Sequence, residues 1–452
     1  MALKGLDIFK LTPKSNCKEC GCPTCMAFGM KVAQGALDIS KCPHLSADAL
    51  ATLSEATAPP MKTVKVGTGD AECTLGGETV LCRHEKTFVS KTRYAVAVSC
   101  CDADADAKLA AAKTVDYERI GERMHVEMLY LQYCGDCGAD AYADFVKKAA
   151  ADTDKVLVLD CQDVDAAKAA LDVCKDAKPI LDGANASNYE AMSKLATEAG
   201  VVLGVRGADI NELYDTIAAI EKLGNKNLVF NAGTASIKDA FAVAVQARRA
   251  CLAKNPDRTF GYPSIVNVAA LAPGDQAMQA ALASLFTMKY GSIVVMEGMT
   301  YAQALPLYGL RQNVFTDPQK PMRVEPGIYA LNGGDENSVC LVTVDFALTY
   351  FLVSGELERS GVPCNLLISD AGGLSVLTSW AAGKFSSTSI AKFVTENVEP
   401  KVKSRKLIIP GKVAVLKGDV EAKLPGWEVI VAPNEAVQLV KFLKDMKANG
   451  EI

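Results

Sequence analysis

Short runs of β-type residues alternate with helix-length segments over residues 93–297, and this alternation constrains the fold more than any other feature. The intervening segments are rich in alanine and amphipathic, as in "NYEAMSKLATEAG" (188–200) and "INELYDTIAAIEKLG" (210–224). Eight strands alternating with helices over about 250 residues are typical of a (β/α)8 barrel. The runs are "RYAVAVS" (93–99), "VEMLYLQ" (126–132), "KVLVLD" (155–160), "KPILDG" (178–183), "VVLGV" (201–205), "NLVFN" (227–231), "SIVNVA" (264–269) and "SIVVME" (292–297).

Two features of this region leave an alternative open. The fourth run, "KPILDG", is the weakest strand signal, and a doubly wound open sheet would show a similar alternation.

Between the first two runs, "DADADAKLAAAKTVDYERIGE" (102–122) has the composition of a helix, and its acidic start suits a helix N-terminus.

Two segments rich in proline or glycine divide the chain. The Pro-Pro pair of "ATAPPMK" (56–62) and the irregular stretch 317–338 both break the regular pattern. We therefore expect an N-terminal module over 1–57, the barrel over 60–316 and a further α/β domain over 325–452.

The C-terminal segment repeats the alternation on a smaller scale and predicts an open, doubly wound α/β domain. Its strand candidates are "CLVTVDF" (340–346), "CNLLISD" (364–370), "KLIIP" (406–410), "KVAVLK" (412–417) and "WEVIVA" (427–432). Its helix candidates are "LTYFLVSGELERSG" (348–361), "SVLTSWAAGKF" (375–385), "SIAKFVTENVEP" (389–400) and "NEAVQLVKFLKDM" (434–446).

Five cysteines gather near the N-terminus, in "NCKECGCPTC" (16–25) and "KCPHL" (41–45). Three of them share one Gly-Pro loop, and the last returns after a short helix predicted over Thr24–Gly35 and is followed directly by a proline. A loop that wraps a cubane in this way, with a Cys-Pro end, is typical of a [4Fe–4S] site. The predicted ligands have the spacing C-x2-C-x4-C-x16-C and are Cys17, Cys20, Cys25 and Cys42.

Other ligand choices remain open at this stage. Zinc is the alternative metal, although it prefers two C-x2-C pairs separated by a spacer. Using Cys22 in place of Cys20 would give the plant-type two-iron order, but we expect Cys22 to lie beside the cluster without binding it. His44 is expected to lie on the surface or next to the metal ligands, without binding the metal itself.

The remaining cysteines and histidines carry weaker signals. "YCGDCG" (133–138) offers a C-x2-C pair after a predicted strand, yet no further ligand lies near it in sequence, so a thiol-lined loop is expected. The adjacent Cys100 and Cys101 are expected to be packing thiols. His84 and His125 are isolated, and no histidine follows residue 125, so a histidine-based site is excluded from the rest of the chain.

Three strand-to-helix turns of the C-terminal domain are expected to meet at one sheet edge, where ligands of doubly wound folds bind. The first carries Thr343 and Thr349. The second is "SDAGGLSVL" (369–377), whose glycines Gly372 and Gly373 let a ligand approach the backbone N–H groups that follow. The third is "VAPNEA" (431–436). These turns predict a ligand but do not identify it.

Composition excludes several classes of protein. The net charge is −5 and neither Lys nor Arg forms a long run, which disfavours nucleic acid or an anionic membrane as a partner. No apolar stretch reaches the roughly 20 residues that span a bilayer, and the first residues do not resemble a signal peptide, so a cytoplasmic protein is expected. The 16 cysteines are then expected to be thiols and metal ligands, which suits an anaerobe.

The cysteine loop "NCKECGCPTC…KCPHLS", the barrel and the tail "TVDFALTYF…DAGGLSVLTSWAAGKF…IIPGKVAVLKG…GWEVIVAP" together resemble one family. It is the large (gamma) subunit of the corrinoid iron–sulfur protein of the acetyl-CoA synthase/CO dehydrogenase pathway. The resemblance covers the whole chain and implies an α/β protein with a small N-terminal [4Fe–4S] module, a central (β/α)8 TIM barrel and a C-terminal Rossmann-like corrinoid-binding domain.

The resemblance also implies site residues. Cys17, Cys20, Cys25 and Cys42 match the family's cluster ligands, while Cys22 lies outside that pattern. A contact from the loop 432–436 is implied, with Pro433 and Ala436 as the candidates. The other implied corrinoid contacts are Thr343, Thr349, Gly373, Leu374, Ser375 and Val376. Many B12 domains place a histidine beneath cobalt; this tail contains none, so a base-off cobamide is expected.

By this resemblance the chain is a methyl carrier of the Wood–Ljungdahl pathway of carbon fixation. Its implied partners are a small subunit completing a heterodimer, a methyl-tetrahydropterin methyltransferase, acetyl-CoA synthase/CO dehydrogenase and a reductive activator. Two alternatives remain: a pterin-binding barrel methyltransferase with a structural cluster, and a plain electron-transfer module. The barrel strand ends show no evident group of Asp and Asn acceptors for a pterin beyond "VFNAG" (229–233).

Overall fold

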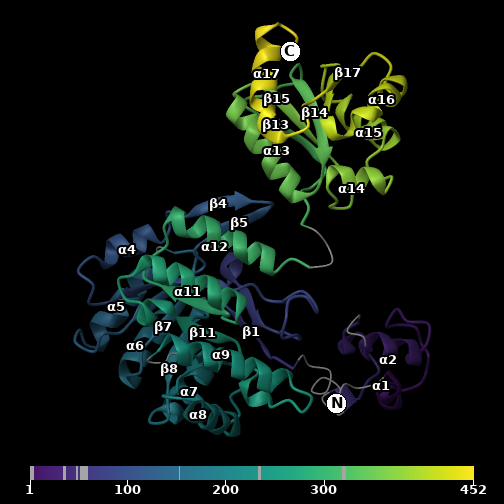
Figure 1. Ribbon diagram of the computed structural model, residues 1–452. Helices are drawn as coiled ribbons and strands as arrows, with labels where there is room; N and C mark the ends of the chain where they lie inside the picture. The colour runs from purple at the N-terminus through teal and green to yellow at the C-terminus, as the bar shows by residue number, and fades with distance from the viewer. Residues whose placement is uncertain are drawn as a thin grey trace. The chain divides into compact units, whose positions relative to one another are not determined.

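The computed structural model describes residues 5–33, 37–46, 49–50, 60–151, 153–232, 236–317 and 322–452. The chain forms two compact units, residues 1–117 with 124–315, and residues 118–123 with 316–452 (Figure 1). The predicted linker residues 56–59 and 318–321 lie outside the described residues, and the division into three domains stays a prediction. Within the described part of the chain, no helix is long and apolar enough to cross a bilayer.

The first unit contains a closed barrel of eight parallel strands. Each strand pairs with the next along the chain, and the last pairs with the first. The prediction of a (β/α)8 barrel is confirmed, "KPILDG" included, and the open-sheet alternative for this region is wrong. The strands are β3 (Arg93–Ser99), β6 (Met128–Gln132), β7 (Val156–Asp160), β8 (Ile180–Ala184), β9 (Val202–Val205), β10 (Leu228–Asn231), β11 (Ser264–Asn267) and β12 (Ile293–Met296).

Side chains along each barrel strand alternate between two cores, because successive residues of a strand point to opposite faces. On β3, Ala95 and Ala97 belong to the cluster inside the barrel, whereas Val96 and Val98 pack with the surrounding helices. The strands are buried on both faces, which explains their nearly continuous apolar sequences. The helices of this unit are α4 (Ala105–Ala111), α5 (Ala139–Ala151), α6 (Val164–Cys174), α7 (Tyr189–Ala199), α8 (Ile210–Lys222), α9 (Ile237–Leu252), α10 (Val268–Leu271), α11 (Gln276–Met288) and α12 (Tyr301–Val314).

A two-stranded hairpin that the sequence analysis did not anticipate precedes the barrel. Strands β1 (Thr63–Val66) and β2 (Cys73–Gly76) pair antiparallel, and their apolar side chains join the cluster inside the barrel. Gly67 N donates to Lys178 O at 2.9 Å, next to the start of β8. The hairpin therefore extends the interior core at the ends where the parallel strands begin.

The predicted helix over 102–122 is wrong in its second half. Helix α4 ends at Ala111, and the chain then forms the hairpin of β4 (Asp116–Arg119) and β5 (Glu122–His125). Its two turn residues, Ile120 and Gly121, both have positive φ angles, of 50° and 66°. Two consecutive residues with positive φ are the signature of a type I′ turn, whose twist matches that of a hairpin.

The second unit contains a five-stranded sheet in the order β13-β15-β14-β16-β17, in which only the edge strand β13 runs antiparallel. Its strands are β13 (Gly327–Leu331), β14 (Val339–Val344), β15 (Cys364–Ser369), β16 (Lys406–Ile409) and β17 (Glu428–Val431). The order confirms the prediction of an α/β sheet, with β14, β15, β16 and β17 at the expected positions. Strand β13 was not predicted, since it lies in the glycine-rich stretch that marked a boundary.

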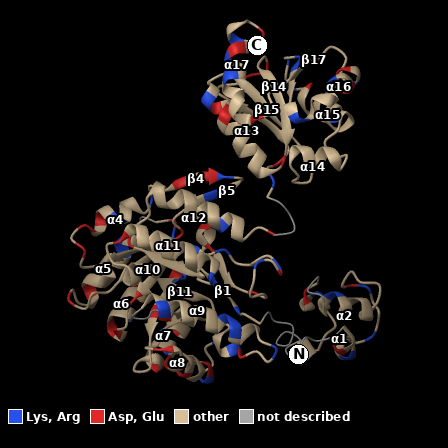
Figure 2. Ribbon diagram, viewed as in Figure 1, with Lys and Arg blue, Asp and Glu red and all other residues tan. Residues whose placement is uncertain are grey.

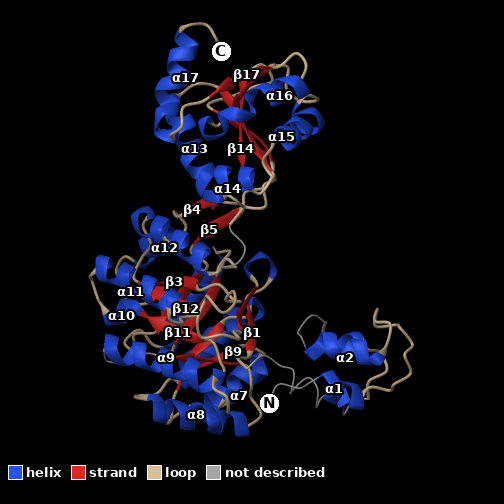
Figure 3. Cartoon of the chain, turned by 45° about the vertical axis from the view of Figure 1, so that its right-hand side comes forward, coloured by secondary structure: helices blue, strands red, loops and turns tan. Residues whose placement is uncertain are grey.

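Helices cover both faces of this sheet (Figure 3). Alternate residues of β14 point to opposite faces and show which helices cover each one. Val339 and Leu341 pack with α13 (Ala347–Ser360) and α17 (Leu439–Ala448). Cys340, Val342 and Val344 pack on the other face with α15 (Ser387–Phe393) and α16 (Lys417–Lys423). A shorter helix, α14 (Val376–Ala381), follows the turn after β15.

The strand predicted for "KVAVLK" (412–417) is wrong. Residues Gly411–Leu416 form a 3-10 helix, and Val413 N donates to Pro410 O at 3.0 Å. Strand β16 already pairs with β14 on one side and β17 on the other, so the segment that follows it directly cannot fold back and pair beside it. In a strand, Val413 and Val415 would point to the same face, but here Val413 is buried and Val415 is exposed.

The N-terminal module consists of α1 (Gly5–Leu11), a cysteine-containing loop, α2 (Cys25–Ala33) and a 3-10 turn over Ile39–Lys41. Ala27 N donates to Thr24 Oγ1 at 3.1 Å, which confirms the predicted N-cap. The predicted end of the helix at Gly35 lies outside the described residues.

We expect the Glu127→Ala substitution to lower the free energy of unfolding by about 3–5 kcal/mol, because it leaves the buried Arg311 guanidinium without its carboxylate partner. Burial would raise the pKa of Glu127, but the charges of Arg311 and Arg93 outweigh it and hold this pKa below its usual range. The carboxylate's contribution is therefore present above the unfolded-state pKa of about 4.3 and lost as the pH falls through the folded-state pKa.

Denaturant unfolding of the full chain at neutral and acidic pH measures this effect. The control is Lys194→Ala, which removes an exposed ion pair with Glu198 at 4.0 Å and should change stability by less than about 0.5 kcal/mol. Equal stability of the two variants at neutral pH would contradict the role assigned to Glu127.

Candidate functional site

The N-terminal cysteines lie on a tightly wound loop. Lys14, Asn16, Lys18 and Gly21 all have positive φ angles, between 49° and 75°, so the backbone curls repeatedly within eight residues. Asn16 N donates to the Cys25 sulfur at 3.4 Å, and its side-chain oxygen accepts from Cys25 N at 2.8 Å. A backbone amide directed at a cysteine sulfur is a feature of iron–sulfur sites, where such hydrogen bonds tune the potential.

The cysteines of this loop differ in burial. Cys25 and Cys42 are buried, Cys20 is partly buried and Cys17 is exposed. Cys22 is 2% exposed and packs with Ile8, Phe28 and the other apolar residues of the module. Cys22 thus contributes to the module's core, and both its predicted place beside the cluster and the ligand set stay predictions. His44 is exposed and lies 3.0 Å from Glu19, as expected of a surface imidazole.

The three C-terminal turns meet around one hollow of about 270 Å³. Parallel pairing brings the carboxyl ends of β14, β15, β16 and β17 to the same sheet edge. Gly373 and Leu374 lie in the second of these turns but do not line the hollow. The residues singled out from the sequence that do line it are Thr343, Thr349, Ser375, Val376, Pro433 and Ala436.

Thr343 places a polar atom in the wall of the hollow. The residue is only 3% exposed, and among the described residues its hydroxyl oxygen has no hydrogen-bond partner. Leaving a buried hydroxyl unsatisfied costs about 1–3 kcal/mol, which a ligand with a hydrogen-bonding group would recover. The orphaned hydroxyl therefore fits a site built for a ligand that bears polar groups.

Asp345 holds the glycine-containing turn beside the hollow, and the sequence analysis missed it. Its carboxylate is fully buried, and Oδ1 accepts from Ala371 N and Gly373 N, each at 3.0 Å. Oδ2 lies 3.4 Å from the guanidinium of Arg323. The available signal was an acidic residue directly after a buried strand.

Apolar side chains surround the hollow. Leu352 from α13 and Leu377 from α14 line it although they are 57% and 46% exposed. Figure 2 shows α14 and the first half of α13 without charged residues. Exposed apolar groups that gather around a concave site mark a surface for binding, because isolated ones would scatter.

The barrel strand ends carry a polar cluster, which corrects the expectation that no group of Asp and Asn acceptors would form there. Arg206 binds both Asp160 and Asp182, and Asp182 also accepts from Tyr130 OH at 2.8 Å and Asn231 Nδ2 at 2.7 Å. Burial raises the pKa of Asp160 although the charge of Arg206 opposes the shift. Both carboxylates are thus satisfied within the protein. Gly233 of "VFNAG" lies outside the described residues.

Residues 63–443 match the family model described as CO dehydrogenase/acetyl-CoA synthase delta subunit, and residues 13–44 match one described as a putative Fe-S cluster. The corrinoid/iron-sulfur protein large subunit of Moorella thermoacetica is 40% identical over 98% of this chain and 99% of that protein. The chain belongs to this family of large subunits. The match to the putative Fe-S cluster model, over residues 13–44, spans all four predicted cluster ligands.

Archaeal relatives extend the same family. The acetyl-CoA decarbonylase/synthase complex subunit gamma of Methanopyrus kandleri is 34% identical over 98% of this chain and 97% of that protein. The gamma subunit of Archaeoglobus fulgidus is 31% identical over 97% of each chain. Among solved structures, 7,8-dihydropteroate synthase from Vibrio fischeri covers 50% of this chain and 97% of that chain with 13% identity and a TM-score of 0.36, values that support no functional argument.

We expect the Asp345→Ala substitution to lower the free energy of unfolding of the C-terminal unit by about 3 kcal/mol, because two buried amides lose a charged acceptor. Denaturant unfolding measures the loss. The matched control is Asp370→Ala in the same turn: that carboxylate is exposed and accepts from Gly372 N, so its loss should cost less than about 1 kcal/mol. The reverse order would contradict the positioning role of Asp345.

Proposed function

We propose that the chain is the corrinoid-binding methyl carrier of the acetyl-CoA pathway. The observation that carries the proposal is the hollow at the C-terminal sheet edge, where three turns meet around the orphaned Thr343 hydroxyl. The relatives support it, because one is named a corrinoid/iron-sulfur protein and others are named subunits of the acetyl-CoA decarbonylase/synthase complex.

The chain's own residues would hold a cobamide by a combination of polar and apolar contacts. Thr343 and Thr349 offer hydroxyls, Ser375 begins the turn into α14, and the exposed leucines offer an apolar surface. Val376, Pro433 and Ala436 in the wall of the hollow, with Gly373 and Leu374 in the turn beside it, complete the proposed set of contacts. A bound cobamide supplies a cobalt centre that accepts and donates a methyl group, chemistry that the side chains do not perform themselves.

The base-off state is proposed from the absence of histidine after residue 125. With no imidazole in the tail, this chain has no histidine to offer beneath the metal. A low coordination number favours Co(I) over Co(II), which suits a carrier that works through the reduced state.

The N-terminal loop is proposed to hold a [4Fe–4S] cluster through Cys17, Cys20, Cys25 and Cys42. The tightly curled loop and the amide directed at Cys25 support this ligand set. We assign the cluster to single-electron reactivation of Co(II) after accidental oxidation, rather than to each methyl transfer.

The proposed partners follow from the chemistry and from the relatives' names. A methyl-tetrahydropterin methyltransferase loads the carrier, acetyl-CoA synthase/CO dehydrogenase unloads it, and a reductive activator supplies electrons. A small subunit is proposed to complete a heterodimer. The chain is thus proposed to act as a carrier subunit, with the bond-making carried out by its cofactor and its partners.

A pterin-binding barrel methyltransferase is less well supported. The acceptors that would bind a pterin exist in the polar cluster, but Arg206 already pairs with Asp160 and Asp182. A plain electron-transfer module would leave the hollow and its apolar rim without a role. Methyl transfer from methyl-tetrahydrofolate by the chain alone would favour the barrel enzyme.

The Thr343→Val substitution tests the hollow. We expect cobamide binding to weaken by about threefold to tenfold, because a hydrogen bond is lost, while the cobamide-free chain becomes no less stable, because an unsatisfied hydroxyl is removed. Cobalt content, the cobamide absorption spectrum and denaturant unfolding of the anaerobically purified heterodimer measure both effects. Thr395→Val, at an exposed position, is the control. A cobalt-free wild-type protein that retains its cluster would reject the carrier role.

The Cys20→Ser substitution separates the two metal centres. We expect cluster iron and reactivation of Co(II) to be lost, while methyl transfer starting from Co(I) continues at nearly the wild-type rate. Iron analysis, electron paramagnetic resonance and a single-turnover methyl-transfer assay measure these separately. The matched control is Cys22→Ser, which should keep the iron. Loss of iron in the Cys22 variant with retention in the Cys20 variant would overturn the ligand assignment.

A further inference from the structure

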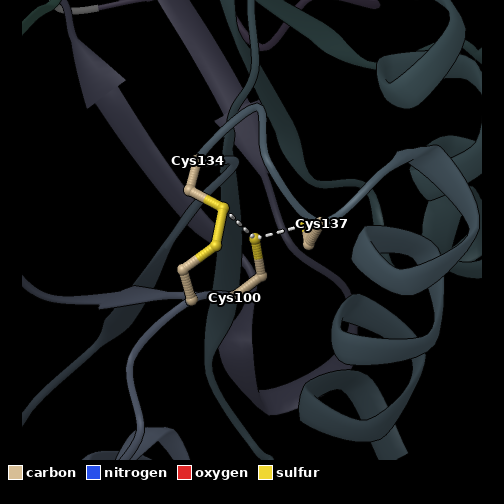
Figure 4. Close-up of side chains that lie close together, drawn as sticks. Cys100, Cys134 and Cys137 are labelled. Carbon is tan, nitrogen blue, oxygen red and sulfur yellow. Dashed lines mark hydrogen bonds between the residues drawn. A yellow bond between two sulfur atoms is a disulfide. The ribbon is translucent and has the colours of Figure 1, made fainter.

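Four cysteines from two separate loops converge on the first unit. Cys100 and Cys101 follow β3, and Cys134 and Cys137 follow β6; their sulfur atoms all lie within 4.8 Å of one another. Figure 4 shows three of them turned toward a common point. The sequence analysis treated the two pairs separately, as packing thiols and a thiol-lined loop, because Cys134 follows Cys101 by 33 positions.

Strand pairing explains the convergence. β3 and β6 are parallel neighbours in the barrel, with Ser99 opposite Gln132, so the loops after them begin side by side. Cys100 N donates to Gln132 O at 3.1 Å and continues the pairing into the loops. Gly135 and Gly138 adopt φ angles of 84° and 79°, which a residue with a side chain rarely adopts. These glycines turn the C-x2-C segment so that both its sulfurs approach Cys100.

The four sulfurs are close enough to reach one metal ion once the Cys101–Cys134 bond is opened. The Cys100 sulfur lies 3.0 Å from that of Cys137 and 3.5 Å from that of Cys134, and Cys101 is joined to Cys134 by a disulfide. A tetrahedral ion with metal–sulfur bonds of about 2.3 Å holds its four sulfurs roughly 3.8 Å apart. A cubane would spread its four ligands farther than a single ion does. With the disulfide reduced, the four sulfurs need only small side-chain shifts to surround a single ion, so their convergence favours a mononuclear site.

The cluster also has the accessibility that a metal site needs. Cys101 is exposed and the other three cysteines are partly buried, at the ends of the strands where barrel proteins carry their functional groups. By contrast, Cys161 and Cys174 of the same unit are buried and donate to backbone carbonyls. Cysteines with a purely packing role are expected to resemble Cys161 and Cys174, not the four-cysteine cluster.

We propose that Cys100, Cys101, Cys134 and Cys137 bind a single thiophilic divalent ion, Zn²⁺ or Fe²⁺, as four thiolates. The site is separate from the N-terminal cysteines and does not depend on the proposed carrier function. Reduction of the Cys101–Cys134 bond by a dithiol takes two electrons and two protons and leaves the dithiol as a disulfide. Binding of the ion then releases four protons from the four thiols.

Metal analysis of the full chain tests the proposal. The Cys20→Ser chain, which has lost a predicted N-terminal ligand, is reduced with dithiothreitol under anaerobic conditions, freed of reductant and loaded with Zn²⁺. We expect about one zinc ion per chain more than in the same chain carrying Cys137→Ser or Cys134→Ser. The matched control is Cys174→Ser, which should keep the zinc because its sulfur lies outside the cluster.

Alkylation with iodoacetamide followed by peptide mass spectrometry gives a second readout. We expect Zn²⁺ to slow alkylation of all four cysteines. The ion bound as purified is the metal whose content falls by about one per chain from the wild-type chain to the Cys137→Ser chain, because iron of the N-terminal cluster is common to both. Equal zinc in the parent chain and both cluster variants would overturn the proposal. So would four iron ions that depend on Cys137, or a Cys101–Cys134 disulfide that persists after dithiol treatment.

Discussion

Parallel strand pairing places the carboxyl ends of neighbouring strands at one edge, and every candidate site outside the N-terminal module depends on this constraint. In the barrel it brings the loops after β3 and β6 together and gathers Asp160, Asp182 and Asn231 around Arg206. In the C-terminal sheet it joins three turns around the hollow that contains Thr343. Residues far apart in sequence therefore share a site because their strands share hydrogen bonds.

In the N-terminal module the candidate ligands are brought together by local backbone conformation, not by strand pairing. Its cysteines are close in sequence, and left-handed residues from Lys14 to Gly21 curl the loop locally. Such a site needs little from the rest of the chain, so its ligand spacing could be recognised before any fold was known. The C-terminal hollow lacks that local signature. Its Gly-Gly turn depends on the buried carboxylate of Asp345, which lies in a different turn of the sheet.

The strands were predicted best, because a strand buried on both faces has an apolar run that few other structures produce. The failures occurred where local composition and tertiary context disagreed. Residues 116–122, the second half of the predicted helix, belong to a hairpin around Ile120 and Gly121. "KVAVLK" alternates like a strand but directly follows β16, whose two sides are already paired. The polar cluster at Arg206 was missed because its members come from different strands.

The barrel, the C-terminal α/β sheet and the spacing of the N-terminal cysteines could all be predicted from the sequence, since periodicity and short-range spacing are local properties of a chain. The meeting of Cys100 and Cys101 with Cys134 and Cys137 became visible only in the folded chain, as did the burial of the Thr343 hydroxyl with no hydrogen-bond partner among the described residues. The reason is physical: a contact between distant segments depends on which strands pair and in what register, and no short stretch of sequence contains that information.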